Sequence, residues 1–329
     1  PNKHFDPKGK LPSEFTIEFQ NGQRKTLPFE DKRDFDEAKK GFIAAPEYKQ
    51  IMAEAGHVAW DMASYEFLLT DKEYDTIHPS LQRQAVLNMA YGLYEVLPDK
   101  IYQVRGYDLA NITFIKGDTG WVIFDPLTAK ETAAAALKFI NEQLGERPVA
   151  AVIYSHSHAD HFGGVRGVVD EADVRSGKVP VIAPVGFMDH AVAENVYAGN
   201  AMTRRMFFQY GVLLPRSPFG HVDQSIGKNT AAGNLGLIPP NTIVEGDIEE
   251  MTEINNRLSR SITVDDGMPK VDDDDIIVDD DEGVSTSEET IFPVTLLVLM
   301  CMIMGLIGII LGVPLIIIIV ILKRSKRSK

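Results

Sequence analysis

A run of 29 residues without a charged side chain is the feature of this sequence that most restricts how it can fold. The run extends from Val294 to Leu322, and five of the seven residues that follow it are basic. The hydrocarbon core of a bilayer is roughly 30 Å thick and takes about 20 apolar helical residues to cross. The run can therefore span it with a tilt or with a bend at Pro314, although a buried helix of a soluble protein is the other explanation. We predict a transmembrane helix over residues 291–322 and a basic tail over residues 323–329.

The charges beside this run predict its orientation. Basic residues tend to stay on the cytoplasmic side of a membrane, so we expect a single-pass membrane protein whose C-terminus is cytoplasmic and whose N-terminal region is extracytoplasmic. The lipid bilayer is then one partner. Gly308 and Gly312 have the four-residue spacing that lets two membrane helices approach closely, and a homodimer through this helix is a further expectation.

An acidic tract precedes the apolar run. Residues 265–289 contain twelve Asp or Glu and one basic residue, Lys270. Such charge density opposes compaction, and we predict a disordered linker over residues 246–290. A calcium-binding loop would need oxygen ligands at defined spacings around a central Gly, which a simple run does not supply. The net charge of −14 and the absence of a basic stripe exclude nucleic acid as an expected partner.

The first 100 residues are predicted to be helical. Over residues 34–69 and 79–97, apolar side chains recur at spacings of three and four, as at Phe35 and Ala38. This periodicity is typical of amphipathic helices. We therefore interpret residues 1–100 as a helical N-terminal flank of the region that follows.

The pattern changes after residue 101 to short apolar strands and a helix. The expected elements are strands over 112–116, 121–125 and 149–154 and helices over 129–144 and 189–210. A turn containing Gly117 and Gly120 joins the first two strands, and Gly211 ends the last helix. The order strand, helix, strand indicates an α/β region, in which ligands usually bind at the carboxyl ends of the strands.

Four candidate metal ligands follow the last of these strands within six residues. In the motif H-S-H-A-D-H at residues 156–161, His156 and His158 are two residues apart, so in extended backbone they point to the same side and can share an ion. Asp160 and His161 come after a turn and permit a second ion. In the alternative explanation the histidines only cap a helix or form hydrogen bonds within a loop, but such a role does not require three histidines and an aspartate within six residues.

Zinc is the metal that this donor set indicates. It takes imidazole nitrogen and carboxylate oxygen, and the only cysteine, Cys301, lies in the apolar run. A bound zinc ion lowers the pKa of its water to about 7, which makes hydrolysis the expected reaction class. Asp160 is the candidate catalytic residue, as a metal ligand, as a proton acceptor for the water, or as both in succession. Gly163 and Gly164 would allow close backbone approach beside the site.

Three other residues are candidates for binding a metal or a sulfate. His221 could be a distal ligand, but a lone loop histidine beside a glycine is more often a surface residue. Arg204 and Arg205 could contact a sulfate, but adjacent arginines on a helix usually form a solvated face.

The motif after a strand resembles that of the metallo-β-lactamase superfamily, and its surroundings resemble the class III alkyl sulfatases. The similar stretches are residues 103–113, 117–120, 125–127, 161–165 and 194–205, and the resemblance extends from about residue 4 to about residue 244. It implies an αββα sandwich with two Zn²⁺ ions, one held by His156 and His158 and the other by Asp160 and His161. It also implies that the substrate is a small-molecule alkyl sulfate or a similar amphiphile, which is hydrolysed to an alcohol and sulfate.

The fold class expected is therefore α/β, a metallo-β-lactamase-like αββα sandwich represented by its first half over residues 101–245. In the family the second half supplies further acidic and histidine ligands, which have no counterpart here. Three hypotheses follow: a zinc-dependent sulfuric ester hydrolase; a membrane-anchored remnant that binds metal or amphiphile without turnover; and a superfamily hydrolase of another ester, thioester or lactam.

Overall fold

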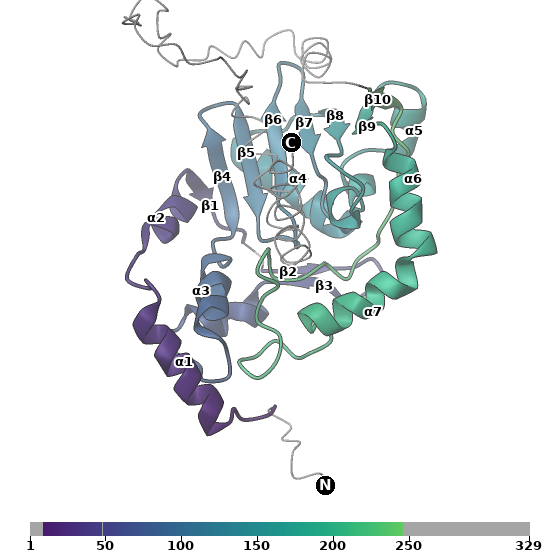
Figure 1. Ribbon diagram of the computed structural model, residues 1–329. Coiled ribbons are helices and arrows are strands. Elements are labelled where there is room, and N and C mark those ends of the chain that lie inside the picture. The colour runs from purple at the N-terminus through teal and green to yellow at the C-terminus, as the bar shows by residue number, and fades with distance from the viewer. Residues whose placement is uncertain (1–8, 48, 246–329) are drawn as a thin grey trace, which may run out of the picture. The chain divides into compact units, whose positions relative to one another are not determined.

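A computed structural model describes residues 9–47 and 49–245 of the chain (Figure 1). The chain divides into two compact units, Pro1–Val264 and Asp265–Lys329, and every described residue belongs to the first. The expected acidic linker, transmembrane helix and basic tail lie outside the described residues. Within the described part of the chain, no helix is long and apolar enough to cross a membrane.

The described residues form α-helices, ten strands and short helical turns. The helices are α1 Glu14–Thr26, α2 Arg33–Lys39, α3 Pro79–Leu87, α4 Lys130–Leu144, α5 Glu171–Arg175, α6 Phe187–Val192 and α7 Gly199–Tyr210. The strands are β1 Phe42–Ala44, β2 Gln50–Met52, β3 Val58–Asp61, β4 Gly92–Leu97, β5 Ile101–Arg105, β6 Ile112–Lys116, β7 Trp121–Phe124, β8 Val149–Ile153, β9 Val181–Pro184 and β10 Thr242–Val244. The turns are η1 Ala63–Leu69, η2 Ala159–His161, η3 Val165–Gly167 and the π-helical turn η4 Ala193–Tyr197.

Eight of the strands form one mixed sheet. Their order is β1-β4-β5-β6-β7-β8-β9-β10. Neighbours from β1 to β7 pair antiparallel, and neighbours from β7 to β10 pair parallel. Helix α4 makes the crossover between the parallel strands β7 and β8, as such a pair requires. Strands β5, β7, β8 and β9 therefore point the same way, and their carboxyl ends share one edge of the sheet.

The main core lies between the sheet and α4. Helix α4 buries Ala133, Ala136 and Ile140, which lie three to four residues apart and so share one face. The strands contribute alternate residues to the same core, namely Tyr102, Val104, Ile112, Phe114, Ile123, Val152 and Val181. Each large apolar side chain buried in this way contributes about 1.5–3 kcal/mol. The core thus fixes the sheet that carries the candidate site.

A second core cluster joins the hairpin β2–β3, the turn η1 and helix α3. Its buried members include Trp60, Tyr65 and Leu68. The indole of Trp60 donates to the carbonyl of Gly106 at 2.7 Å, which links this cluster to the end of β5. Trp121, fully buried in the main core, donates to Oδ1 of Asn141 at 2.8 Å. Both tryptophans are core residues.

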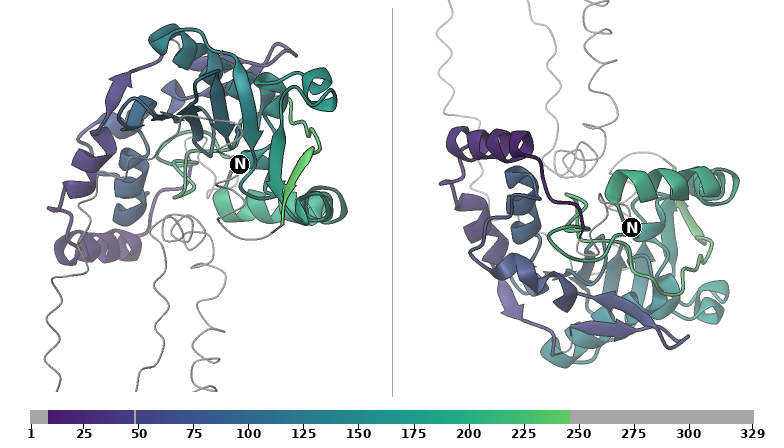
Figure 2. Two further views of the ribbon diagram at one scale, coloured as in Figure 1. Left: turned by 90° about the horizontal axis from the view of Figure 1, so that it is seen from above. Right: turned by 90° about the horizontal axis from the view of Figure 1, so that it is seen from below.

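The expectation of a helical flank over residues 1–100 was wrong in part. Residues 34–69 form helix α2, the strands β1, β2 and β3 and the turn η1, and residues 92–97 form β4. Gly41 has φ +69°, a left-handed conformation that ends α2 and that only glycine adopts freely. Because β1 and β4 belong to the main sheet, the sheet begins well before residue 101. Figure 2 shows α1 and α2 toward the end of this sheet that β1 forms, and α6 and α7 toward the end that β10 forms.

The elements expected after residue 101 agree closely with the structure. Strands β6, β7 and β8 and helix α4 lie where the sequence predicts them, and β6 pairs antiparallel with β7. The helix expected over 189–210 is present as α6, η4 and α7, and Gly211 ends it with φ +62°.

The fold is α/β, as expected, with one large sheet covered by α4. The second sheet of an αββα sandwich is absent from residues 9–47 and 49–245, where the only other sheet is the two-stranded β2–β3. The described residues thus correspond to the half-sandwich that the sequence predicts.

Candidate metal centre

The four expected ligands follow the carboxyl end of β8, an interior strand of the sheet between β7 and β9. The backbone runs from Ile153 through His156 into the short turn η2, which contains Asp160 and His161. Strand β7 ends next to β8, because the two are parallel neighbours. The loop after β7 therefore faces the histidine loop.

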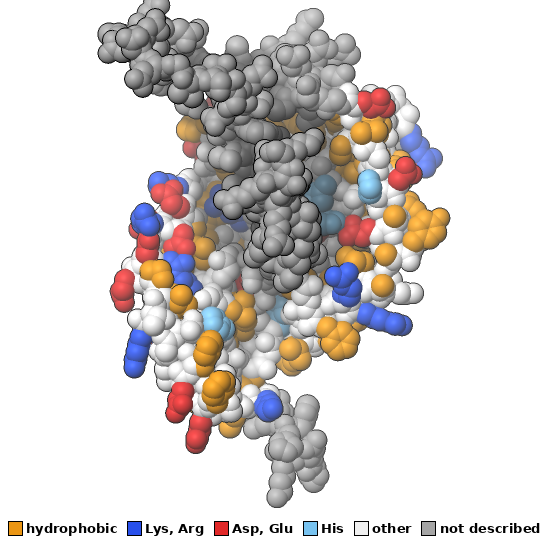
Figure 3. Space-filling view, in the orientation of Figure 1, with side chains coloured by type: hydrophobic (Ala, Val, Ile, Leu, Met, Phe, Trp, Pro, Cys, Tyr) orange, Lys and Arg blue, Asp and Glu red, His pale blue; other side chains and the backbone are white. Residues whose placement is uncertain are grey.

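The side chains of the four expected ligands come close together. The ring of His156 lies 4.1 Å from that of His161 and 4.6 Å from that of His158, measured between centroids. Oδ2 of Asp160 is 3.2 Å from Nε2 of His161. All four residues are partly accessible to solvent. The space-filling view shows histidine and acidic side chains at the surface on this face of the molecule (Figure 3).

Asp125, directly after β7, holds two of these imidazoles. Its Oδ2 accepts from Nδ1 of His161 at 2.8 Å and from Oγ of Ser155 at 2.7 Å, and its Oδ1 accepts from the backbone N–H of Ser155 at 2.8 Å. Oγ of Ser155 also lies 2.8 Å from Nδ1 of His156. Since the hydroxyl proton goes to Asp125, Nδ1 of His156 is the donor in this last bond.

These bonds place a proton on Nδ1 of both imidazoles. With Nδ1 of His156 and of His161 acting as donors, Nε2 of each ring is the nitrogen left to bind a metal. A carboxylate that orients a ligating histidine is a common partner in metal sites. Asp125 is thus a positioning residue.

The surroundings of the loop shift the pKa values of His156 and His161 in opposite directions. Burial, together with the nearby His161 and His158, lowers the pKa of His156 to about 4, which keeps this imidazole neutral at pH 7. Burial would lower the pKa of His161 too, but hydrogen bonds to Asp125 and Asp160 raise it to about 10. Burial would raise the pKa of Asp160, yet the bond to His161 holds it below its ordinary value. Without a metal, His161 is therefore a cation between two carboxylates.

The glycines after the motif allow the loop to pack tightly. A Cβ on Gly163 would lie 2.3 Å from the carbonyl oxygen of Thr128, and one on Gly164 would lie 2.1 Å from that of Pro126. Gly164 donates its N–H to the carbonyl of Leu127 at 2.8 Å. The expected close backbone approach is confirmed, and it joins the histidine loop to the loop after β7.

The donor chemistry fits a divalent metal, although the side chains are not fully converged. Within the described residues no group of three His, Cys, Asp or Glu is placed to hold an ion as it stands. Two ligands of one tetrahedral zinc ion, each about 2.0–2.1 Å from it, lie about 3.3–3.5 Å apart. The 3.2 Å between Asp160 and His161 is close to that separation. Since the low pKa of His156 keeps its imidazole neutral, this ring needs no deprotonation before it binds a metal.

A second buried carboxylate supports the loop after β7. Asp108 accepts five hydrogen bonds, and its donors are the N–H groups of Leu109, Thr128 and Ala231 and the hydroxyls of Thr128 and Thr132. Burial nevertheless raises the pKa of Asp108. This role could not be predicted from the sequence, because the partners of Asp108 are distributed over more than 120 residues.

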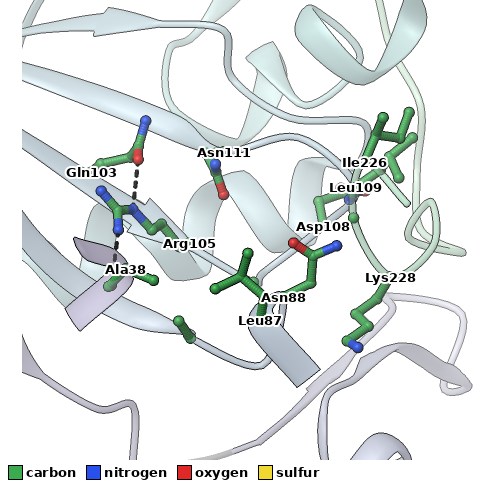
Figure 4. Close-up of a pocket in the computed structure, with 13 residues that line it drawn as sticks. Ala38, Leu87, Asn88, Gln103, Arg105, Asp108, Leu109, Asn111, Ile226 and Lys228 are labelled. Atoms are coloured by element: carbon green, nitrogen blue, oxygen red, sulfur yellow. Dashed lines mark hydrogen bonds between the residues drawn. The ribbon is translucent and has the colours of Figure 1, made fainter. Parts of the chain in front are cut away.

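A cavity of about 230 Å³ lies elsewhere, near the end of β5. Arg105 lies in its wall, donating to Oε1 of Gln103 at 2.7 Å and to the carbonyl of Ala38 at 3.3 Å (Figure 4). None of the four expected metal ligands lines this cavity. The cavity and the histidine loop are therefore separate features.

The interpretation of His221 as a surface residue was wrong. Its side chain is buried, with 2% of the residue exposed, and Nδ1 lies 3.0 Å from the hydroxyl of Tyr65. Its Nε2 is buried without a hydrogen-bond partner among the described residues. Nearby, the buried Lys228 forms an ion pair with Asp223 at 3.1 Å. No contact joins His221 to the histidine loop in the described structure. Arg204 and Arg205 are exposed on α7, and their contact with a sulfate stays a prediction.

Comparison with known proteins identifies relatives of this region. Residues 105–283 match the family model described as the metallo-beta-lactamase superfamily. The chain is 48% identical over 246 residues to an (R)-specific secondary-alkylsulfatase of Pseudomonas sp, covering 74% of this chain and 37% of that protein. It is 50% identical over 228 residues to an alkyl/aryl-sulfatase of Saccharomyces cerevisiae, covering 69% of this chain and 35% of that protein.

A solved structure agrees with these matches. The fold is similar to that of a stereoselective inverting sec-alkylsulfatase from Pseudomonas sp., with a TM-score of 0.69 and 49% sequence identity. The match covers 74% of this chain and 38% of that structure. The chain thus spans little more than a third of the length of these relatives.

Proposed function

This chain belongs to the metallo-beta-lactamase superfamily, in which it is similar to part of the alkyl sulfatases, and from this premise we propose that it is a zinc-dependent hydrolase of alkyl sulfate esters. The observation that carries the proposal is the cluster of His156, His158, Asp160 and His161. Asp125 orients two of its imidazoles, that of His161 directly and that of His156 through Ser155. The relatives are named for the cleavage of alkyl sulfates. Their reaction releases an alcohol and sulfate.

The residues of the cluster have distinct roles in this proposal. His156 and His158 would hold one zinc ion, and Asp160 and His161 would hold the other. When bound, zinc supplies a water molecule acidic enough to lose a proton near neutral pH and a positive charge for the leaving sulfate. Asp125, through its bond to His161 and through Ser155 to His156, would keep Nε2 of both rings available to the metal. Asp160 would accept a proton from the water or serve as a ligand.

The substrate class has support near the site. The turn η4, whose Glu194 lies beside His158, carries large apolar side chains at its surface, namely Val196 and Tyr197, which are 70% and 86% exposed. An alkyl chain would gain about 0.8 kcal/mol for each CH₂ group that it buries against such a surface. An amphiphile of small size therefore suits this region better than a fully polar ester.

The test uses the full chain, purified in a non-ionic detergent that contains no sulfate ester. Metal content is measured after treatment with EDTA and reloading with Zn²⁺, and sulfate release from dodecyl sulfate is followed by ion chromatography. We expect zinc binding and EDTA-sensitive release of sulfate, both lost in His158→Ala and both kept in His190→Ala, a change at an exposed histidine. A chain that binds no zinc would overturn the proposal.

A binding protein without turnover is the second candidate function. It is favoured by the finding that no three of these side chains in the described residues are converged on one point. Zinc binding without sulfate release from dodecyl sulfate, or from a panel of thioesters, lactones and β-lactams, would support it. Hydrolysis of one panel member alone would instead assign that substrate class.

We also propose that residues 294–322 anchor the chain in a membrane. The proposal is based on the length of the uncharged run and on the basic residues after it. Expressed chain should stay in the membrane pellet after carbonate extraction, and a cysteine introduced at Ser328, in a Cys301→Ser background, should react with an impermeant maleimide only after the membrane is opened. Release by carbonate would overturn the anchor, and labelling of intact cells would reverse the orientation.

A further inference from the structure

Glu194 lies against the histidine loop although it is 36 residues away from it along the chain. Its Oε1 is 3.5 Å from Nε2 of His158, and a quarter of its side chain is exposed. Glu194 belongs to η4, which follows β9 and α6. Since β9 is the parallel neighbour of β8, the segment after β9 returns next to the loop after β8.

The distance between these two atoms is informative. A hydrogen bond between N–H and a carboxylate oxygen is usually 2.7–3.2 Å long, and 3.5 Å is beyond that range. It equals the separation of about 3.3–3.5 Å expected for two ligands of one tetrahedral zinc ion. The atom of His158 that faces Glu194 is Nε2, which is also the ring atom left free for metal in His156. The two side chains thus have the spacing of co-ligands.

No other cation in the described part of the chain accounts for the position of Glu194. Its only ion-pair partner there is His158. Arg204 and Arg205, on the next helix, are exposed and form no ion pair with it among the described residues. A cation bound there would be a favourable partner for a carboxylate that is three-quarters buried and has no Lys or Arg ion pair among the described residues.

The backbone that carries Glu194 departs from a regular helix. The N–H of Ala198 bonds to the carbonyl of Ala193 at 2.9 Å, a spacing of five residues that defines a π turn. The side chain of Asn195 donates to the carbonyl of Ala191 at 2.9 Å, the acceptor that the N–H of residue 195 would use in an α-helix. The sequence therefore supports the turn locally. Single π turns in helices occur frequently at functional sites.

We propose that Glu194 is a metal ligand and that it coordinates the same ion as His156 and His158. The inference depends on the proposed metal binding and deepens it. No three of these side chains are converged as they stand in the described residues, but the neighbouring pairs His156–His158 and His158–Glu194 would give two imidazoles and one carboxylate, a set that leaves the fourth position of zinc open for water or substrate. With Glu194 the first ion has a carboxylate donor from within the described residues.

The test measures metal affinity rather than turnover. Full chain in non-ionic detergent is stripped with EDTA and titrated with Zn²⁺ against a chromophoric chelator, and the visible spectrum of the Co²⁺-loaded chain is recorded. Glu194→Gln keeps the shape of the side chain but removes its charge. We expect it to weaken binding of one ion by tenfold or more and to change the Co²⁺ spectrum. Glu194→His, which restores a donor, should recover most of the affinity.

The matched control is Asp189→Asn, which removes the same charge from an exposed position on α6, five residues earlier. It should bind both metals like the unmodified chain. If Glu194→Gln keeps the affinity and the Co²⁺ spectrum of the unmodified chain, Glu194 is not a ligand, whereas the proposed function stands. If the unmodified chain binds no metal, the proposed function and the inference both fail. Circular dichroism of the metal-free variants confirms that they fold.

Discussion

Oδ2 of Asp125 lies 2.8 Å from Nδ1 of His161, and the same oxygen accepts the hydroxyl proton of Ser155. Through that hydroxyl the carboxylate also reaches Nδ1 of His156. Asp125 has φ +56°, a left-handed conformation that is uncommon outside glycine and easiest for Asp and Asn. Residue 125 must therefore adopt a positive φ and also supply a carboxylate that accepts several hydrogen bonds.

Asp125→Asn should weaken metal binding by about 10–100-fold, the usual effect of losing a partner that orients a ligand. Asparagine tolerates the positive φ, so the backbone is kept while the acceptor strength falls. Zinc affinity by chelator competition is the measurement. Asp118→Asn, in the exposed turn between β6 and β7, is the control, and equal affinities for the two variants would contradict the positioning role.

Asp108→Asn should lower the free energy of unfolding by about 2–4 kcal/mol. In the folded chain Oδ2 of Asp108 accepts from the N–H of Thr128 and from the hydroxyl of Thr132. An amide NH₂ in place of either oxygen would face donors and leave at least one of them unsatisfied. Urea unfolding followed by tryptophan fluorescence measures the change. Asp71→Asn, at an exposed position, should leave the midpoint unchanged, and a similar result for Asp108→Asn would refute this account.

The buried His221 should make the fold less stable as the pH falls. Burial, aided by Arg216 and Lys228, lowers its pKa from 6.5 to about 4. Between these two values the unfolded chain binds a proton that the folded chain does not, so stability is fully present above pH 6.5 and decreases as the pH falls toward 4. At about 1.4 kcal/mol for each of about 2.5 pH units, the full effect is about 3.5 kcal/mol.

Urea unfolding at several pH values would measure this effect. His221→Gln removes the titrating group and should flatten the dependence of stability on pH between 6.5 and 4. His190→Gln, at an exposed position, should keep the slope of the unmodified chain. An unchanged slope in His221→Gln would show that other groups cause the loss.

Gly164→Ala should destabilise the fold and weaken metal binding together. The added Cβ would lie 2.1 Å from the carbonyl oxygen of Pro126 and 2.6 Å from that of Ala129, and backbone atoms cannot move aside without shifting the loop. We expect a loss of about 1–3 kcal/mol, as for other overpacked sites, and a parallel loss of zinc affinity. Gly22→Ala, in α1 with open space around it, should be neutral or stabilising by up to about 1 kcal/mol. Thermal unfolding midpoints compare the two.

The part of the fold after residue 101 was predictable from the sequence because its elements are long or strongly patterned. The strand Ile112–Lys116 and the helix Lys130–Leu144 are delimited by turn residues and have a clear period. The N-terminal part was not predictable in this way. Strands β1 and β2 have three residues each, too few to show an alternation. Phe35 and Ala38 have a helical spacing, but the helix that contains them, α2, ends at Lys39.

The candidate site was predictable only where its residues are close in sequence. His156, His158, Asp160 and His161 follow one another and have the spacing of metal ligands. The roles of Asp125 and Glu194 depend on contacts across 36 residues in each case, and these contacts exist only because β7, β8 and β9 are parallel neighbours. The sequence showed Asp125 as the end of a strand and Glu194 as part of a helix.

Because Asp125 contacts both His161 and Ser155, the two proposed metal positions would not bind their ions independently. His156 would belong to one ion and His161 to the other, yet both rings are restrained by one side chain. Binding of the first ion would restrict the motion of Asp125 and Ser155. The imidazole that binds the second ion would then already be oriented. Binding of the two ions should then be cooperative, and a single substitution at Asp125 would weaken the binding of both.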